Sequence, residues 1–268
     1  MKRMTGFLLI LLTIVPPVSG QSPGPIEDPS DAVFQVVTYD REPDKDGDFR
    51  AHGFGTGFFI SPDGTALTAS HVVYLAAHDP ARYRLLGVVG KQGRREFYDV
   101  KLICSTKLPY DPSKSDTNQA GVPYTKDVAE IKLEPSTAFE GRKETLSYLL
   151  TDGTRLAWAK AHTGALPPFP FLTVGGSPER NVRVIGFGAI SPLPYEWTAD
   201  GNVGRFWTAR DGTPLFDVVS QNPPQPGDSG SPVLNDKNEV VGIFAWRYYQ
   251  KPDTGTAQGN TILIRPCP

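Results

Sequence analysis

The chain of 268 residues has only two cysteines and four histidines. Two cysteines cannot build a disulfide scaffold, and these two are not spaced as zinc ligands. No His-Glu-x-x-His segment is present, so the sequence predicts no metal site and calls for no cofactor. Basic side chains are no more frequent than acidic ones, 27 against 29, which argues against a protein that binds nucleic acid.

Long apolar runs are also scarce, and the one at the start is too short to span a membrane. Residues 7–15 read FLLILLTIV, between the basic pair Lys2 and Arg3 and the small residues of 16–20, PPVSG. A spanning helix needs about 20 apolar residues, whereas this arrangement is typical of a secretory signal peptide. Residues 1–20 are therefore predicted to be removed, leaving a secreted or periplasmic protein with no stable membrane anchor.

The mature chain would have about 248 residues, with 25 basic and 29 acidic side chains and a formal charge of −4. This length fits one large domain or two small ones that share a cleft. Glycine (27) and proline (26) are both frequent, and long runs with helical periodicity are hard to find. This composition predicts short strands joined by many turns.

Two sets of short apolar segments predict the strands. They are 32–39, 56–61, 65–70, 84–90, 96–104 and 128–133 in the first set, and 182–190, 205–209, 215–220, 239–247 and 261–265 in the second. The clearest hairpin joins 56–61 to 65–70 through Pro62, Asp63 and Gly64, where proline fixes one φ angle and glycine supplies a positive one.

The two sets predict an all-β fold of two six-stranded antiparallel β-barrels, with the active site in the cleft between them. Residues 21–30 would be a proline-rich leader, 31–135 the N-terminal barrel and 171–268 the C-terminal barrel. Residues 136–170 would connect the barrels, with a helical pattern over 142–150. Because a fold does not specify a function, the polar residues at strand ends must do so.

Ser229 lies in the most turn-prone segment of the chain, 227–233, which reads GDSGSPV. A serine hydroxyl is a weak nucleophile unless a base removes its proton. The glycines around Ser229 let the backbone aim the N–H groups of Gly227 and Ser229 into one concavity, as a developing oxyanion requires. An isolated Gly-Asp-Ser-Gly would otherwise be an ordinary hairpin turn.

A histidine and an aspartate occupy suitable positions elsewhere. His71 directly follows the predicted strand 65–70, and Asp127 directly precedes the predicted strand 128–133. A histidine that serves as a base needs a carboxylate to fix its tautomer. Taken singly, His71 could be a structural histidine, and Asp127 a solvated charge at the end of a loop.

Taken together, these segments resemble a known family. Residues 55–73, 127–133 and 227–233, in the order His, Asp, Ser, are similar to the three signature regions of chymotrypsin/trypsin-like serine peptidases. Residues 182–188 resemble the strand that opens the second barrel of this family, and 241–246 the strand that lines its substrate cleft. The resemblance extends over nearly all of the mature chain.

The resemblance implies a monomeric, secreted serine endopeptidase that cleaves polypeptides through an acyl-enzyme intermediate. Ser229 would be the nucleophile, His71 the general base and acid, and Asp127 the carboxylate that orients the histidine. The backbone N–H groups of Gly227 and Ser229 would form the oxyanion hole. The residues that would contact the substrate are Pro223, Ala245, Trp246 and Arg247.

The chain also departs from the animal trypsins. Val72 stands where those enzymes have a cysteine after the catalytic histidine, and the hairpin before it is closer to bacterial HtrA-type members. Pro223 replaces the acid at the base of the primary pocket, and Arg247 replaces a glycine. These changes predict a preference for an uncharged side chain before the scissile bond, or for an acidic one if Arg247 reaches the pocket.

Several alternatives stay open at this stage. The same barrels could form a non-catalytic peptide- or protein-binding protein, although that class usually lacks a member of the triad and this chain does not. An α/β-hydrolase is disfavoured because 227–231 lacks the second glycine of Gly-x-Ser-x-Gly, and no helical pattern follows. Cys104 and Cys267 could form one disulfide, worth about 3–4 kcal/mol, or remain two thiols.

The sequence also predicts whether the protein needs a cleavage to become active. Trypsin-like zymogens are cut to expose an apolar N-terminus that pairs with the aspartate before the catalytic serine. That aspartate is present as Asp228, but residues 21–30 contain no basic residue at which such a cut could be made. Because a buried carboxylate is costly without a partner, Asp228 is predicted to use internal donors or to remain partly hydrated. The protein should then be active once the signal peptide is removed.

Overall fold

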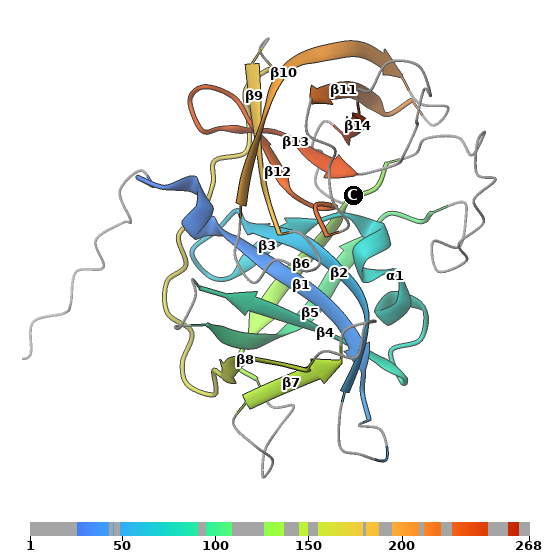
Figure 1. Cartoon of the computed structure of the whole chain (residues 1–268), viewed down its shortest axis with the longest axis vertical. Coiled ribbons are helices and arrows are strands. Elements are labelled where there is room, and N and C mark those ends of the chain that lie inside the picture. The colour runs from blue at the N-terminus through green and yellow to red at the C-terminus, as the bar shows by residue number, and fades with distance from the viewer. Residues whose placement is uncertain are drawn as a thin grey trace, which may run out of the picture.

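The fold is almost entirely β-structure (Figure 1). The computed structural model describes residues 26–42, 45, 49–90, 95–108, 126–136, 145–149, 155–178, 181–187, 195–208, 212–220, 227–245 and 257–262. Within these residues there are fourteen strands, one short α-helix, α1 (Ser70–His78), and one 3-10 turn, η1 (Pro29–Ala32). In this part of the chain no helix is long and apolar enough to cross a membrane.

The first half of the chain builds one sheet of eight strands. They are β1 (Val33–Asp40), β2 (Phe49–Phe59), β3 (Thr65–Thr68), β4 (Tyr83–Val89), β5 (Glu96–Ser105), β6 (Ala129–Glu134), β7 (Thr145–Leu149) and β8 (Arg155–Ala161). Their order is β1-β4-β5-β6-β3-β2-β7-β8, with additional pairings of β1 with β2 and of β5 with β8. The hairpin of β7 and β8 joins the sheet through parallel pairings to β2 and β5.

The second half forms a closed six-stranded barrel, as the sequence predicts. Its strands are β9 (Asn181–Gly186), β10 (Tyr195–Thr208), β11 (Pro214–Ser220), β12 (Pro232–Leu234), β13 (Val240–Ala245) and β14 (Ala257–Ile262). The order around the barrel is β10-β11-β14-β13-β12-β9. All of its neighbouring strands pair antiparallel.

The hairpin of β2 and β3 is the local prediction that the structure follows most closely. Phe58 pairs with Leu67 and Phe59 with Ala66, and Gly64 in the turn has a φ of +88°. A stack of aromatic rings supports it from inside, because Phe59 lies 4.6 Å from Phe34 and 4.4 Å from Phe169 between ring centroids. Phe169 belongs to the segment between the two sheets, so that segment packs on the first sheet.

Two local predictions were wrong. The segment 142–150, expected to be helical, contains β7 instead, because its residues 145–149 find backbone partners in β8 and β2. The strand expected over 65–70 stops at Thr68, and α1 begins two residues later. The start of α1 places Val72 and Val73 in the core, so tertiary packing favours a helix where the apolar pattern is too short to reveal one.

One cluster of buried hydrophobic side chains is built from both halves of the molecule. This cluster of buried side chains includes Val33, Phe58 and Leu67 from the first sheet, and Ile185 and Ile243 from the barrel. Burial of such side chains contributes about 1.5–3 kcal/mol each. A shared core of this kind holds the ends of β3 and β12 in a fixed relation, and the candidate site lies at these ends.

Candidate active site

His71 and Asp127 form a close pair at the start of α1. The Nδ1 atom of His71 lies 2.6 Å from Oδ2 of Asp127, and the His71 backbone N–H donates to Oδ1 at 2.9 Å. The side chains are 22% and 10% exposed, so water reaches the imidazole more easily than the carboxylate. Since a carboxylate can only accept, Nδ1 carries the proton, and in the neutral ring Nε2 is an acceptor.

The Asp127 carboxylate also takes the place of a helix cap. The N-cap residue of α1 is Ala69, whose side chain has no oxygen to offer the free N–H groups of the first turn. The bond from the His71 N–H to Asp127 satisfies one of these groups. A negative charge at a helix N-terminus is also favoured by the helix dipole, by about 0.3–1 kcal/mol. Two features of α1 therefore hold the carboxylate in place.

Ser229 lies in a tight turn just before β12, and glycines shape this turn. Gly227 and Gly230 have φ angles of +102° and +92°, which side chains rarely adopt. A Cβ atom on Gly230 would lie 2.1 Å from the carbonyl oxygen of Thr56 and 2.4 Å from Oγ1 of Thr68. Only glycine fits at this position, because the turn is pressed against β2 and β3.

The Ser229 turn meets the start of α1 through Gly55 of β2. A Cβ atom on Gly55 would lie 2.5 Å from both γ-carbons of Val72 and 3.0 Å from the carbonyl oxygen of Ser229. The N–H of Thr56 donates to that same Ser229 oxygen at 2.8 Å. The backbone of β2 therefore contacts both the residue after His71 and Ser229 itself, which brings the three sequence-predicted side chains into one region.

The two predicted oxyanion donors lie on this turn. Within the described residues, the N–H groups of Gly227 and Ser229 have no protein acceptor. The hydroxyl of Thr56 fixes the turn from below by donating to the Gly227 carbonyl at 2.9 Å, and it accepts from the Phe187 N–H at 2.9 Å. The turn is thus attached to both halves of the molecule. Within the described residues, the N–H groups of Gly227 and Ser229 remain available to bind an oxygen atom.

Asp228 is fully buried, and it is not without a partner. Gly186 of β9 lies against it, since a Cβ atom there would be 3.0 Å from Oδ1 of Asp228 and 2.3 Å from Oγ of Ser231. The expectation that this carboxylate would stay partly hydrated does not hold. Of the two predicted possibilities, the one that remains is that partners within the protein satisfy the Asp228 carboxylate.

Of the four residues predicted to contact the substrate, the structure describes one. Ala245 ends β13, is 9% exposed and pairs with Asn260 of β14. Its neighbour Phe244 accepts a hydrogen bond from the Gly230 N–H at 2.7 Å, so β13 runs directly beside the Ser229 turn. Pro223, Trp246 and Arg247 lie outside the described residues.

Sequence reasoning missed three hydroxyl-bearing residues that support the site. Thr56 holds the Ser229 turn, while Ser70 and Thr106 bond the backbone next to Asp127. The one available signal was the position of Ser70, a polar residue between Ala69 and His71 at the end of an apolar strand. Cys104 of β5 is disulfide-bonded, and Cys267, the other cysteine of the chain, lies outside the described residues.

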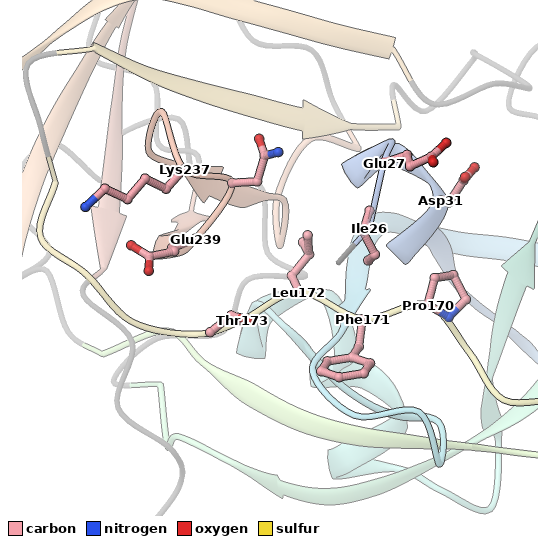
Figure 2. A pocket seen from close by; sticks show the side chains of 10 residues that line it. Ile26, Glu27, Asp31, Pro170, Phe171, Leu172, Thr173, Lys237 and Glu239 are labelled. Carbon is pink, nitrogen blue, oxygen red and sulfur yellow. The ribbon is translucent and has the colours of Figure 1, made fainter. Parts of the chain in front are cut away.

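A hollow of about 700 Å³ lies elsewhere on the molecule. Figure 2 shows η1 on one side of it and the turn between β12 and β13 on the other, with Leu172 between them. Ile26, Leu172 and Phe171 provide apolar surface, and Glu27, Lys237 and Glu239 provide charges. None of its lining residues is a predicted site residue, so it is separate from the site at His71.

Comparisons with known proteins agree with this geometry. Residues 55–243 match the sequence pattern of the trypsin-like peptidase domain, and the chain therefore belongs to that family. The matched range includes His71, Asp127 and Ser229.

The solved structure of Deg5 has a similar fold, with a TM-score of 0.51 at 14% sequence identity over 85% of this chain and 83% of that one. No curated protein matches the sequence.

Proposed function

We propose that this protein is a serine endopeptidase in which Ser229, His71 and Asp127 act as a catalytic triad. The observation that carries the proposal is the 2.6 Å contact between His71 Nδ1 and Asp127, next to a glycine-shaped turn that presents Ser229. A histidine held in this tautomer directs the basic Nε2 away from the carboxylate. Membership of the trypsin-like peptidase family supports the assignment.

The reaction follows from the roles of the three groups. His71 Nε2 takes the proton of the Ser229 hydroxyl as Oγ attacks the peptide carbonyl, and the resulting imidazolium is stabilised by Asp127. His71 then gives that proton to the departing amine, which leaves an acyl group on Ser229. In the second half His71 takes a proton from water, the hydroxide attacks the acyl carbonyl, and Ser229 regains its proton as the acid is released.

The N–H groups of Gly227 and Ser229 would bind the oxygen that becomes negatively charged during each attack. Their availability within the described residues supports this role. Preorganised donors of this kind are worth about 10²–10³ in rate for each donor. The Thr56 hydroxyl would keep them in position by holding the Gly227 carbonyl.

The proposed cleft lies between the barrel of β9 to β14 and the first sheet, which we interpret as a second barrel. The interpretation is supported by the pairing of β1 with β2, which connects the two ends of the series β1-β4-β5-β6-β3-β2. The N-terminal barrel would then occupy residues 31–135 and the C-terminal barrel residues 171–268. The hairpin of β7 and β8, within the connector 136–170, packs on the first barrel.

The remaining parts of the proposal rest on the sequence. We infer a secreted or periplasmic location after removal of residues 1–20, action as a monomer, and a preference for an uncharged side chain before the scissile bond. The preference follows from Pro223, which offers no charge to a basic side chain.

A library of unmodified peptides, incubated with residues 21–268 and read by mass spectrometry, tests the proposal. We expect cleavage mainly after uncharged side chains, and none by the matched variant Ser229→Ala. Cleavage that persists in Ser229→Ala would remove Ser229 from its role. If neither protein cleaves while both bind peptides, the chain is a binding protein on the same fold. A profile dominated by Lys and Arg would contradict only the stated preference.

A further inference from the structure

A single hydroxyl group bonds the backbone on both sides of Asp127. Oγ1 of Thr106, just after β5, lies 2.7 Å from the carbonyl oxygen of Lys126 and accepts from the Val128 N–H at 3.1 Å. These are the peptide groups that flank Asp127. Their attachment to one atom fixes the backbone angles of Asp127, and with them the direction in which its side chain leaves the chain.

A second hydroxyl links this arrangement to His71. Oγ of Ser70 donates to the Val128 carbonyl at 2.6 Å, accepts from the Thr106 N–H at 3.1 Å and lies 2.8 Å from Oγ1 of Thr106. Ser70 immediately precedes His71 in the chain and is 2% exposed. The two hydroxyls therefore connect the backbone that carries the imidazole to the backbone that carries the carboxylate.

The hydrogen atoms available to this pair determine which bonds can form. Three short oxygen–oxygen contacts join these groups, but only two hydroxyl protons are available for them, because the carbonyls of Lys126 and Val128 cannot donate a hydrogen bond. If Ser70 donates to Val128 and Thr106 donates to Lys126, each hydroxyl oxygen is left to accept an N–H. Both carbonyls then have a donor, whereas the 2.8 Å contact between the two hydroxyl oxygens is left without a proton. Removal of the Thr106 hydroxyl would take a bond from both neighbours of Asp127.

The Ser70 hydroxyl does not serve as the cap of α1. The N-cap residue is Ala69, and the hydroxyl of Ser70 bonds the backbone that leads into β6. The N–H of His71 is bonded by Asp127 instead. One bond links Ser70 to the backbone after Asp127 and the other links His71 to the Asp127 carboxylate, so both connect α1 to the segment that carries Asp127.

We propose that Ser70 and Thr106 are positioning residues that hold the Asp127 carboxylate toward His71 Nδ1. For its effect on catalysis this inference rests on the proposed function. Neither hydroxyl touches the histidine ring in the contacts described, so both would act through Asp127. If the hydroxyls of Ser70 and Thr106 were removed, the 2.6 Å distance between His71 Nδ1 and Asp127 Oδ2 would increase, or the carboxylate would rotate away from the ring.

The main test compares Thr106→Val, which keeps the shape and removes the hydroxyl, with Thr106→Ser, which keeps the hydroxyl. We expect Thr106→Val to lower kcat about 10- to 100-fold with little change in KM, because small errors in placement cost about this much. Thr106→Ser should stay close to the wild type. The inference fails if Thr106→Val has wild-type kcat, or if Thr106→Ser is equally impaired. Ser70→Ala should show a smaller loss, since the Thr106 N–H still bonds Val128.

A double-mutant cycle separates positioning from a general structural role. If Thr106 acts through Asp127, adding Thr106→Val to Asp127→Asn should lower kcat by no more than about twofold further. A full second loss of 10- to 100-fold would show that Thr106 acts by another route, and would overturn the inference.

A spectroscopic readout keeps this inference distinct from the proposed function. The proton on His71 Nδ1, in a short bond to a carboxylate, should give a strongly downfield ¹H NMR signal that moves upfield in Thr106→Val and not in Thr106→Ser. If the wild type cleaves no peptide but the signal responds in this way, the proposed function fails and the positioning role stands. If the wild type cleaves peptides and the signal is unchanged in Thr106→Val, only the positioning role fails.

Discussion

The two halves of the candidate site are held in different ways. On one side, Asp127 and His71 are held by side-chain atoms, with a carboxylate bonded to a ring nitrogen and to a backbone N–H. On the other side, the Ser229 turn is held by its backbone, through glycines at positive φ and bonds to Thr56 and Phe244. Side-chain bonds can be removed one at a time, whereas a backbone conformation is kept or lost as a whole. The first half should therefore respond to mutation in steps, and the second abruptly.

The largest effect should come from the reacting groups of the two halves. We expect Ser229→Ala and His71→Ala each to lower kcat by about 10⁶-fold, because neither group works without the other. Asp127→Asn should cost about 10⁴-fold, since it reverses the tautomer that the histidine must hold. Steady-state kinetics measures these losses, with circular dichroism to show that the fold is kept. Near-normal kcat in His71→Ala would contradict the pairing of the two halves.

Gly230→Ala should disable the Ser229 turn. The new Cβ atom would meet backbone oxygen at 2.1 Å, in addition to the strain of a φ of +92°. Gly212 is a matched control, because its φ is +81° and nothing lies within 4 Å of an added Cβ atom. We expect about 1 kcal/mol of destabilisation in Gly212→Ala, from strain alone, and a much larger loss in Gly230→Ala.

Urea unfolding and kcat measure both effects. Equal destabilisation by Gly230→Ala and Gly212→Ala would show that the Ser229 turn can shift to accommodate a Cβ atom. It would contradict the claim that the backbone conformation of this turn is kept or lost as a whole.

Thr56→Val tests a side-chain bond that holds the Ser229 turn. The fully buried hydroxyl holds the Gly227 carbonyl and the Phe187 N–H, and each group left unpaired costs about 1–3 kcal/mol. We expect lower stability and a lower kcat, with both restored in Thr56→Ser. A stable Thr56→Val protein of normal kcat would mean that the glycine backbone holds the oxyanion donors unaided.

The turn of the hairpin between β2 and β3 gives the smallest effect. Lys132 of β6 donates to Asp63 at 2.8 Å, and this bond, with further bonds from Thr65, holds the pKa of Asp63 well below its usual value. Both side chains are exposed, so the pair is worth less than about 1 kcal/mol. A lowered pKa stabilises the fold above the unfolded value, and that contribution is lost as the pH falls through the folded value.

Asp63→Asn should therefore be slightly less stable than the wild type at pH 7. The difference should shrink steadily as the pH falls from about 4, and urea unfolding at several pH values measures it. A difference that is the same at pH 7 and at the acid end would mean that the charge of Asp63 is not its cause.

The sequence predicts the polar groups of the site better than the elements that carry them. Ser229, His71 and Asp127 could be proposed from the sequence because the chemistry of a triad needs particular residue types beside turns and strand ends. The helix that carries His71 was missed, since nine residues give too little periodicity to outweigh the apolar strand before them. The strand over 145–149 was missed because its partners, β2 and β8, are supplied only by the tertiary fold.

The supporting hydroxyls show the same limit more sharply. Ser70 and Thr106 are 36 residues apart, and Thr56 bonds Gly227 across 171 residues. A serine or threonine beside a strand is common, and nothing local distinguishes one that bonds a distant backbone group from one that bonds water. Sequence patterns locate groups that react, whereas groups that position them become visible only through the fold.

Phosphonylation by a fluorophosphonate tests the central claim most directly, because it requires Ser229 to be an activated nucleophile in the chain without residues 1–20. We expect residues 21–268, with the N-terminus shown to be intact by mass spectrometry, to take up one phosphonyl group on Ser229. Ser229→Ala should take up none, and His71→Ala should react far more slowly. An intact, folded protein that is not labelled, or that is labelled only after a trypsin cut, would contradict the account.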